Sequence, residues 1–589
     1  MALGSQRGFR AGALNRMLSV RLMKISVSLA ICAAAGIGCS HGQILPPNAE
    51  SFARFVDEYF EAEFAFRPTL ATLAGFHQYD PQLEDFSKER TDARIAELKQ
   101  LQARLAAFDL SKLSFDDSID AELLQGDIRG KLLDLETLRL REINPMPYAQ
   151  APGAALDSLM KRNFAPAADR LRSVISRLKA IPAIYAAARS NLKNPPKEFT
   201  DLALRSSRNS VHFLKASVAG WARDAASGSA ALANDFDAAN RDAIAATEQF
   251  AAWLQSDLLP RSNGSYAIGA ANFRAKLKYE EMVDLPLQEL LAKGEGQLAK
   301  DYAAFLETAR KVNPSQPAGA VMKSLSNQHP TAEELIPSVA RSLEEARRFV
   351  VEKQIVTIPS DVRPRVEEMP PYARIGSFAS MNTPGPYETK ATEAFYYVTP
   401  VEKDWDAQHQ EQHLRLYNPF VVAMINVHEA YPGHYLQFLY APIFPTKARK
   451  LLHRGSNAEG WAHYAEQMMV DQGFGGGDPR IRLAQLQEAL LRDCRYVVGI
   501  KLHTEGMTVE EGKQIFVEKG FQEPANAFEE ARRGTYNPTY LYYTLGKLQI
   551  QELREEFKAK RGGNLRSFHD AFVAQGALPI ALLRRTLFR

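Results

Sequence analysis

The 589-residue sequence contains little cysteine, and this scarcity limits how the fold can be held together. Only Cys32, Cys39 and Cys494 are present, and the first two lie in an N-terminal stretch with the features of an export signal. After processing, Cys494 would be the single internal thiol, so no disulfide framework can form within one chain. No cysteine-protease signature surrounds Cys494, which we expect to be a small buried residue.

The sequence also lacks an excess of charge of either sign. Its formal net charge is +3, but residues 1–38 contain five basic side chains and no acidic one (Arg7, Arg10, Arg16, Arg21 and Lys24). Removing these five charges changes the net charge from +3 to −2, and no basic patch remains that would indicate a nucleic-acid partner. The apolar content of 46% and charged content of 24% are typical of a globular protein.

A basic and then apolar stretch stands near the N-terminus. Arg21 to Lys24 form a short basic region, and the apolar run I-S-V-S-L-A-I-C-A-A-A-G-I-G-C follows. The run is too short to cross a bilayer comfortably, which favours export over a permanent membrane helix. Its end resembles a bacterial lipoprotein cleavage box, in which Cys39 would be acylated; ordinary cleavage near residues 33–35 is the alternative. We predict that residues 1–38 are a signal peptide of a periplasmic protein, either lipid-anchored or free.

The first half of the remaining chain has helical periodicity. One apolar stripe contains Ile95, Leu98, Leu101 and Leu105. Similar stripes recur through 117–141, 166–190, 232–258 and 285–310. This half offers little chemistry, and we predict residues 45–353 to be a helical scaffold lobe.

The chain then changes character twice. The short runs Q-I-V-T-I-P, A-R-I-G-S-F and A-F-Y-Y-V predict a small β-sheet within residues 354–402. From residue 403 the pattern is helical again, and Asn418-Pro419, Asp478-Pro479 and Asn537-Pro538 each predict a helix start. We predict residues 403–589 to be a second helical lobe, which carries a metal site. The fold class we expect is mainly α with a small sheet.

The stretch H-E-A-Y-P-G-H supplies the candidate metal site. His428 and His434 are typical zinc ligands, and Glu429 beside them can take a proton from the attacking water. The usual spacing of two such histidines is four, which puts both on one helical face. Here the spacing is six, which turns about 600° on an ideal helix. The motif therefore requires a distorted helix, and Pro432-Gly433 supply the residues for it.

The third ligand should come from a second helix, and Glu459 in S-N-A-E-G-W-A-H is the best candidate. The alternative is a capping box, in which Glu459 bonds back to its own helix start at Ser456. His463 and Glu466 lie on the same helical face and could support the ligands from behind. His409 and His413 form a rival pair at a spacing of four, but no glutamate directly follows the first histidine.

Candidates for binding and polarising a substrate lie further along. His503 and the tyrosines around Tyr540 and Tyr543 could donate to an oxyanion, although tyrosines of this kind are also common in cores. Arginines could bind a substrate carboxylate through two parallel hydrogen bonds. The candidates are Arg492, Arg495, Arg532, Arg533 and Arg554.

These segments together resemble a known family. P-T-L-A-T-L-A-G-F-H-Q-Y-D, H-E-A-Y-P-G-H-Y-L-Q, E-G-W-A-H-Y-A-E, the stretch from Arg492 to His503, and Y-T-L-G-K are similar to the bacterial domain-of-unknown-function 885 (DUF885) family. Its members are predicted zinc hydrolases similar to helical gluzincin peptidases. His463 is a departure, because the family more often has an aliphatic residue at this position.

The resemblance implies a large, two-lobed helical fold of the metallopeptidase kind with a deep cleft. It implies one Zn²⁺ per chain, bound by His428, His434 and Glu459, with Glu429 as general base. Tyr543 or His503 would stabilise the oxyanion, while Arg492, Arg495, Tyr540 and Arg554 are candidates to bind substrate.

We therefore expect an exported zinc hydrolase that cleaves amide bonds, with short peptides as its substrates. Two alternatives remain open at this point. One is hydrolysis of non-peptide amides, such as isopeptide or γ-glutamyl conjugates. The other is a non-catalytic binding lipoprotein, in which the histidine motif only supports a helical scaffold.

Overall fold

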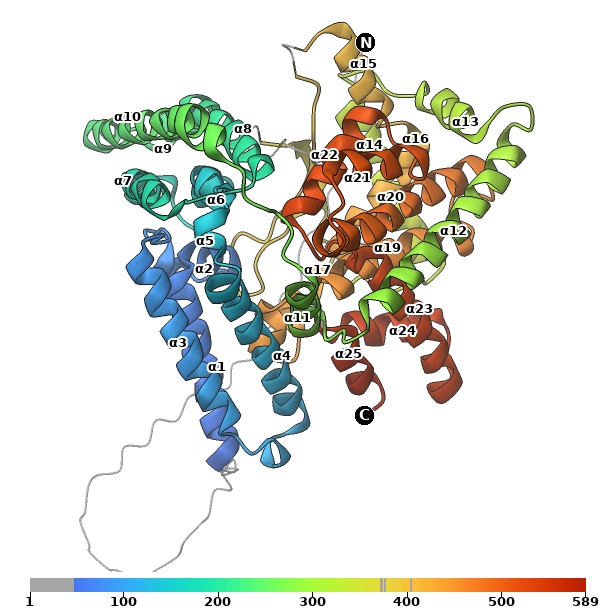
Figure 1. Ribbon diagram of the computed structural model, residues 1–589, viewed down its shortest axis with the longest axis horizontal. Helices are drawn as coiled ribbons and strands as arrows, with labels where there is room; N and C mark the ends of the chain where they lie inside the picture. The colour runs from blue at the N-terminus through green and yellow to red at the C-terminus, as the bar shows by residue number, and fades with distance from the viewer. Residues whose placement is uncertain (1–46, 371–373, 375–377, 403–404) are drawn as a thin grey trace, which may run out of the picture. The chain divides into compact units, whose positions relative to one another are not determined.

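The computed structural model describes residues 47–370, 374, 378–402 and 405–589. The predicted signal peptide and Cys39 lie outside the described residues. Helices occur along the whole colour range of Figure 1, with one small sheet, so the expected mainly α class is confirmed. Within the described part of the chain, no helix combines the length and apolar character needed to cross a membrane.

The helices before the sheet follow the apolar stripes of the sequence. In α3, Ser87 accepts a hydrogen bond from the N–H of Arg90 at the helix start, and Leu98, Leu101 and Leu105 are buried. The bounds are α1 Pro47–Phe66, α2 Pro68–Ala74, α3 Lys88–Ala106, α4 Phe115–Leu132, α5 Leu140–Ile143, α6 Met146–Lys161, α7 Ala167–Asn191, α8 Lys197–Phe213, α9 Ala219–Ala225, α10 Ala230–Trp253, α11 Ala270–Glu281, α12 Leu287–Val312, α13 Ala318–Ser326 and α14 Leu335–Glu352.

Two of the three predicted starts after the sheet are confirmed. The Asn418 and Asp478 side chains accept hydrogen bonds from the N–H groups of Val421 and Arg480. Asn537 starts no helix, because residues 538–541 form a turn. The bounds are α15 Ala407–Arg415, α16 Pro419–Glu429, α17 His434–Leu439, α18 Lys447–Leu451, α19 Gly455–Asp471, α20 Pro479–Thr504, α21 Val509–Glu518, α22 Pro524–Tyr536, α23 Tyr542–Arg561, α24 Leu565–Val573 and α25 Ile580–Leu587.

The sheet has the order β1-β3-β2, with β3 parallel to β1 and antiparallel to β2. The central strand β3 (Ala394–Val398) is buried throughout and is the predicted A-F-Y-Y-V run. Its neighbours are β1 (Pro364–Glu368) and β2 (Ala379–Asn382). The predicted strand at 354–359 is wrong, and most of the run at 373–378 lies outside the described residues.

The first run fails as a strand because side chains, and not another strand, satisfy its backbone. Asp570 accepts the N–H of Thr357, and His569 Nδ1 donates to the carbonyl of Ile355. These contacts bury Ile355 and Val356 in the core without strand pairing.

The apolar core is not divided at the sheet. One buried cluster draws on α1, α3 and α4 as well as on α12, α14 and α16 to α25. A second cluster belongs mostly to α6, α7, α8 and α10. The division of the chain into two helical lobes and a sheet region, with boundaries at residues 353 and 402, stays a prediction.

Two glycines allow α19 and α23 to cross at very close range. A Cβ on Gly460 would lie 2.6 Å from the Cα of Gly546, and one on Gly546 would lie 2.0 Å from the Ser456 carbonyl oxygen. Because only hydrogen occupies these positions, the backbones can approach until they touch. This contact brings Glu459 on α19 and Tyr543 on α23 to the same region of the molecule.

We expect Gly546→Ala to force α23 away from α19 and to lower the free energy of unfolding by about 1–3 kcal/mol. Urea unfolding followed by circular dichroism measures this change. Gly296→Ala in α12 is the matched control, since a Cβ there meets open space and alanine stabilises an exposed helix by about 1 kcal/mol. An unchanged midpoint in Gly546→Ala would show that the two helices are not in contact as described.

Candidate metal centre

The helix that carries the first histidine stops where the motif requires it. α16 ends at Glu429, residues 430–433 form a short irregular connection with a cis Tyr431–Pro432 peptide, and α17 begins at His434. The connection closes on itself through the N–H of Gly433, which donates to the Val427 carbonyl. The six-residue spacing is therefore accommodated by two separate helices.

Gly433 and Trp461 hold this connection in place. A Cβ on Gly433 would lie 1.7 Å from the carbonyl oxygen of His428, so no other residue fits without moving that histidine. Trp461, which is fully buried in α19, donates its indole N–H to the Pro432 carbonyl at 2.8 Å. The connection between α16 and α17 is thus held by the close contact of Gly433 with His428 and by the hydrogen bond from Trp461 of α19.

The N-terminus of α19 is capped by a carboxylate from a distant helix. Glu281, the last residue of α11, accepts hydrogen bonds at 3.0 Å from the N–H groups of Gly455 and Ser456. It also accepts the Ser456 hydroxyl at 2.5 Å. No side chain of α19 itself caps the helix, so the capping-box alternative for Glu459 is excluded and its carboxylate points elsewhere.

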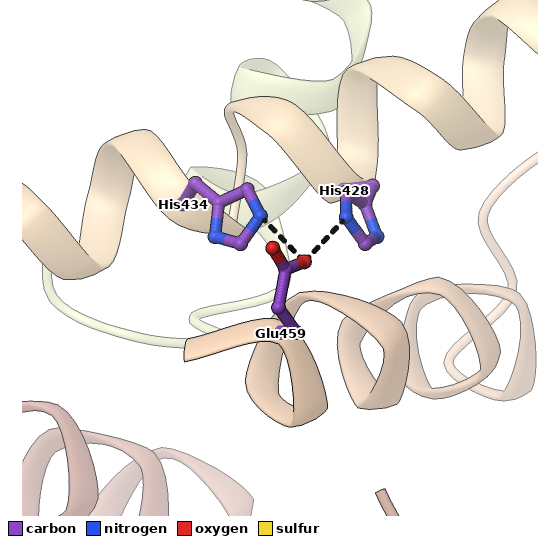
Figure 2. A group of neighbouring side chains, drawn as sticks. All are labelled: His428, His434 and Glu459. Atoms are coloured by element: carbon purple, nitrogen blue, oxygen red, sulfur yellow. Dashed lines mark hydrogen bonds and ion pairs between the residues drawn. The ribbon is translucent and has the colours of Figure 1, made fainter. Parts of the chain in front are cut away.

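Three side chains converge between α16, α17 and α19 (Figure 2). The Nε2 atoms of His428 and His434 lie 3.4 Å and 3.1 Å from Oε2 of Glu459. Within the described residues these three form the one group with ligand atoms within 4.8 Å of one another. Two ligand atoms bound tetrahedrally at about 2.1 Å to zinc lie about 3.4 Å apart, so both distances match such a site.

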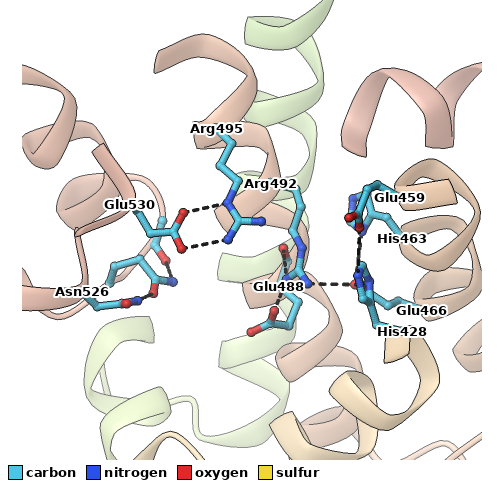
Figure 3. A network of polar contacts seen from close by, with 11 residues as sticks. His428, Glu459, His463, Glu466, Glu488, Arg492, Arg495, Asn526 and Glu530 are labelled. Carbon is cyan, nitrogen blue, oxygen red and sulfur yellow. Dashed lines mark hydrogen bonds and ion pairs between the residues drawn. The ribbon is translucent and has the colours of Figure 1, made fainter. Parts of the chain in front are cut away.

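A layer of buried ion pairs supports His428 from behind (Figure 3). Its Nδ1 lies 2.7 Å from Oε1 of Glu466, whose other oxygen lies 3.2 Å from Nδ1 of His463. Arg492 on α20 lies 3.6 Å from Glu466 and also pairs with Glu488. A carboxylate on the far nitrogen of a histidine is the arrangement that orients metal-binding imidazoles.

The electrostatics of the group favour a positive charge at its centre. Burial alone would lower the pKa of His428, whereas hydrogen bonds to Glu459 and Glu466 raise it to about 9. Burial would raise the pKa of Glu459, but the two imidazoles hold it well below its usual range. The carboxylates therefore stay ionised at neutral pH and favour a proton or another cation on His428.

A cavity of about 550 Å³ opens beside this group, within the range typical of small-molecule sites. His428, Glu429, Arg492 and Tyr543 line it near the triad, and its walls come from α13, β2, α15, α16 and α20 to α23. Burial raises the pKa of Glu429, against the opposing effect of the two imidazoles. The carboxyl group predicted as a base thus faces the cavity beside the ligands.

Tyr543 lies over His428 with a ring-centroid distance of 6.3 Å. Its hydroxyl oxygen accepts a hydrogen bond of 3.0 Å from Arg533, which leaves its proton free to donate. Burial and the nearby Glu459 raise the pKa of Tyr543, although three arginines oppose this. The phenol is therefore protonated at neutral pH and can act as a donor.

Three residues proposed from the sequence do not reach the cavity. His503 is buried and uses both ring nitrogens, one on the Gly534 carbonyl and one on the N–H of Ile268. Tyr540 is buried against Gly499 and Gly534. Arg554 pairs with Glu555 and the Tyr464 hydroxyl. None of the three is among the residues that line the cavity, so Tyr543 is the one predicted oxyanion donor that lies there.

The other histidines considered from the sequence are also held apart from the triad. His413 is buried and lies 2.9 Å from the carbonyl of Thr399, and His409 stacks on Trp405. His463 faces Glu466 but lies outside the metal-competent group, and burial lowers its pKa to about 4.

The family model for bacterial proteins of unknown function, DUF885, matches residues 68–587. The chain belongs to this family. Among solved structures, this DUF885 protein resembles a candidate lipoprotein of unknown function from Shewanella oneidensis, with 28% identity and a TM-score of 0.75 over 91% of this chain and 100% of that one.

A candidate lipoprotein from Colwellia psychrerythraea shares the fold of the DUF885 chain. Its TM-score is 0.77 at 18% identity, over 92% of this chain and 99% of that one. No curated protein matches the chain.

We expect Gly433→Ala to push the His428 carbonyl and its imidazole out of position and to lower the affinity for zinc at least about tenfold. Competition with a chromophoric chelator measures the affinity. Gly220→Ala, at a helical position where a Cβ meets nothing within 4 Å, should leave it unchanged. Equal zinc affinity in both variants would contradict the tight connection described at residues 430–433.

Proposed function

We propose that this DUF885 protein is an exported, zinc-dependent hydrolase that cleaves amide bonds, with short peptides as its substrates. The observation that carries this proposal is the convergence of His428, His434 and Glu459 within 4.8 Å, beside a cavity that His428 and Glu429 line. A purely structural metal site needs neither an open cavity nor an adjacent base.

The residues present fit one Zn²⁺ per chain. Two imidazoles and one carboxylate make up a ligand set typical of catalytic zinc, which leaves a further coordination position open. The distances of 3.1 and 3.4 Å between ligand atoms agree with it. When bound, zinc would act as a Lewis acid that makes water more acidic and polarises a carbonyl group.

The side chains around the ligands have complementary roles in this reaction. Glu429 takes the proton of the attacking water, and its partly buried position strengthens its basicity. Tyr543 donates its hydroxyl proton in a hydrogen bond to the oxyanion that develops on the substrate carbonyl. Arg533 donates a hydrogen bond of 3.0 Å to the Tyr543 hydroxyl oxygen. Because the oxygen accepts from Arg533, the hydroxyl proton of Tyr543 points away from the guanidinium.

The proposed location is the periplasm, with a lipid anchor on Cys39. The N-terminal stretch of the sequence carries a basic region, an apolar run and a terminal cysteine. The Shewanella and Colwellia structures are both described as candidate lipoproteins, which supports the same route for this chain.

A non-catalytic binding lipoprotein is the second candidate. It is favoured by the size of the cavity, about 550 Å³, which suits retention of a small ligand whether or not the ligand reacts. The two candidates differ in what Glu429 does, because a binding protein has no use for a base.

We expect the purified protein to contain about one zinc ion per chain, and we expect His434→Ala and Glu459→Ala each to lose it. Removing one of three protein ligands leaves too few donors to hold the ion. Elemental analysis gives the metal content, and His409→Ala is the control because His409 is exposed and lies outside the group. A wild-type protein that binds no zinc even after zinc is added back would exclude the proposed hydrolase.

We expect Glu429→Gln to keep zinc and to lower turnover by at least about 100-fold, since the amide cannot accept the proton of water. Hydrolysis of a pool of short N-acetylated peptides, followed by mass spectrometry, gives the rate. Unchanged hydrolysis with zinc retained would exclude Glu429 as the base. Loss of zinc in this variant would instead give Glu429 a role in holding the metal.

A further inference from the structure

Four arginines line the cavity beside His428, His434 and Glu459, and three of them already have carboxylate partners. Arg415 pairs with Glu411 at 3.1 Å. Two others on α20 pair with glutamates of the cavity wall: Arg492 with Glu488, and Arg495 with both oxygens of Glu530 at 2.7 and 2.8 Å. The charges of these three arginines are therefore compensated within the protein.

Arg533 is the exception. Among the residues that the structure describes, it forms no ion pair, and its one hydrogen bond goes to the Tyr543 hydroxyl. Glu530 is close enough to raise the pKa of Arg533, after the larger effect of Tyr543, but it gives both oxygens to Arg495. A guanidinium has five donors, so most of those on Arg533 remain available.

Arg533 lies close to the proposed metal ligands, with Tyr543 between them. It contacts the Tyr543 hydroxyl, and the Tyr543 ring stacks over His428. The guanidinium thus lies one side chain away from the proposed zinc ligands. Lys323 also lines the cavity, but it is exposed, so water screens its charge.

We infer that Arg533 binds the free carboxylate of the substrate, which limits the substrates to short peptides with an ionised C-terminus close to the scissile amide. This inference rests on the proposed hydrolase and names the class of peptide that it takes. A partly buried guanidinium without an ion-pair partner favours an anion, and its planar donors match a carboxylate.

A singly charged carboxylate fits this position better than a dianionic phosphate. Arg533 contributes one positive charge, and Glu429, Glu488 and Glu530 also line the cavity. The other three arginines of the cavity are already paired, so a second negative charge on the ligand would gain no further guanidinium. The same reasoning disfavours acidic side chains deeper in the cavity.

Two matched pools of N-acetylated tripeptides test the inference, one with free carboxylates and one with C-terminal amides. We expect the zinc-loaded wild type to cleave the acid pool with kcat/KM about 10- to 100-fold above the amide pool, the range expected for hydrogen bonds to a charged group. Arg533→Met should reduce this ratio to about one, mainly by raising KM for the acids. Arg533→Lys should restore part of it, and Arg310→Gln, an exposed arginine of α12, should leave it unchanged.

The ratio of kcat/KM for the acid and amide pools distinguishes carboxylate binding by Arg533 from its support of Tyr543. Loss of the Arg533–Tyr543 hydrogen bond would slow hydrolysis of both pools alike and leave the ratio unchanged. If the wild type cleaves neither pool, the hydrolase is excluded and the substrate class with it. If it cleaves both equally, or if Arg533→Met keeps the preference, the hydrolase stands and the carboxylate site is excluded. Titration calorimetry of the two pools on zinc-loaded Glu429→Gln gives the same ratio without turnover.

Discussion

His434 lies six positions after His428, and an unbroken helix would point their side chains in different directions around its axis. The end of α16 at Glu429 and the new start of α17 at His434 remove this conflict. Gly433 makes the connection short enough, since its hydrogen faces the His428 carbonyl. The converging ligands, the adjacent Glu429 and the position of Trp461 all depend on this local constraint.

Most charged side chains around that break are paired, but two sites carry an unbalanced charge, one negative and one positive. Glu459 and Glu466 place negative charge on both sides of His428, which favours a cation between the imidazoles. Arg533, on the other side of Tyr543, is a positive charge without a carboxylate of its own among the described residues. A cation between the imidazoles would balance the first arrangement, and the proposed substrate carboxylate would balance the second.

The sequence predicts much of this where the determinants are local. Helical stripes, the Asn418 and Asp478 starts, the β3 strand and the need for a distorted helix at Pro432-Gly433 all follow from neighbouring residues. The strand predicted at 354–359 fails because side chains of α24 satisfy its backbone. The role of Glu281 at the start of α19 could not be predicted, because its partners are 174 and 175 positions away. The sequence names Arg533 as one of five candidate arginines, but it cannot single it out, because its availability depends on Glu530 being paired with Arg495.

The contact between Glu281 and the start of α19 bears on how the chain can be divided. The helix that carries Glu459 begins on a carboxylate supplied by α11, far upstream of the sheet. A fragment cut at residue 403 would expose the first N–H groups of α19 and would lose α12, against which α20 packs. The ligand-bearing helices are therefore not a portable module, and grafting them onto another protein would require the upstream helices as well.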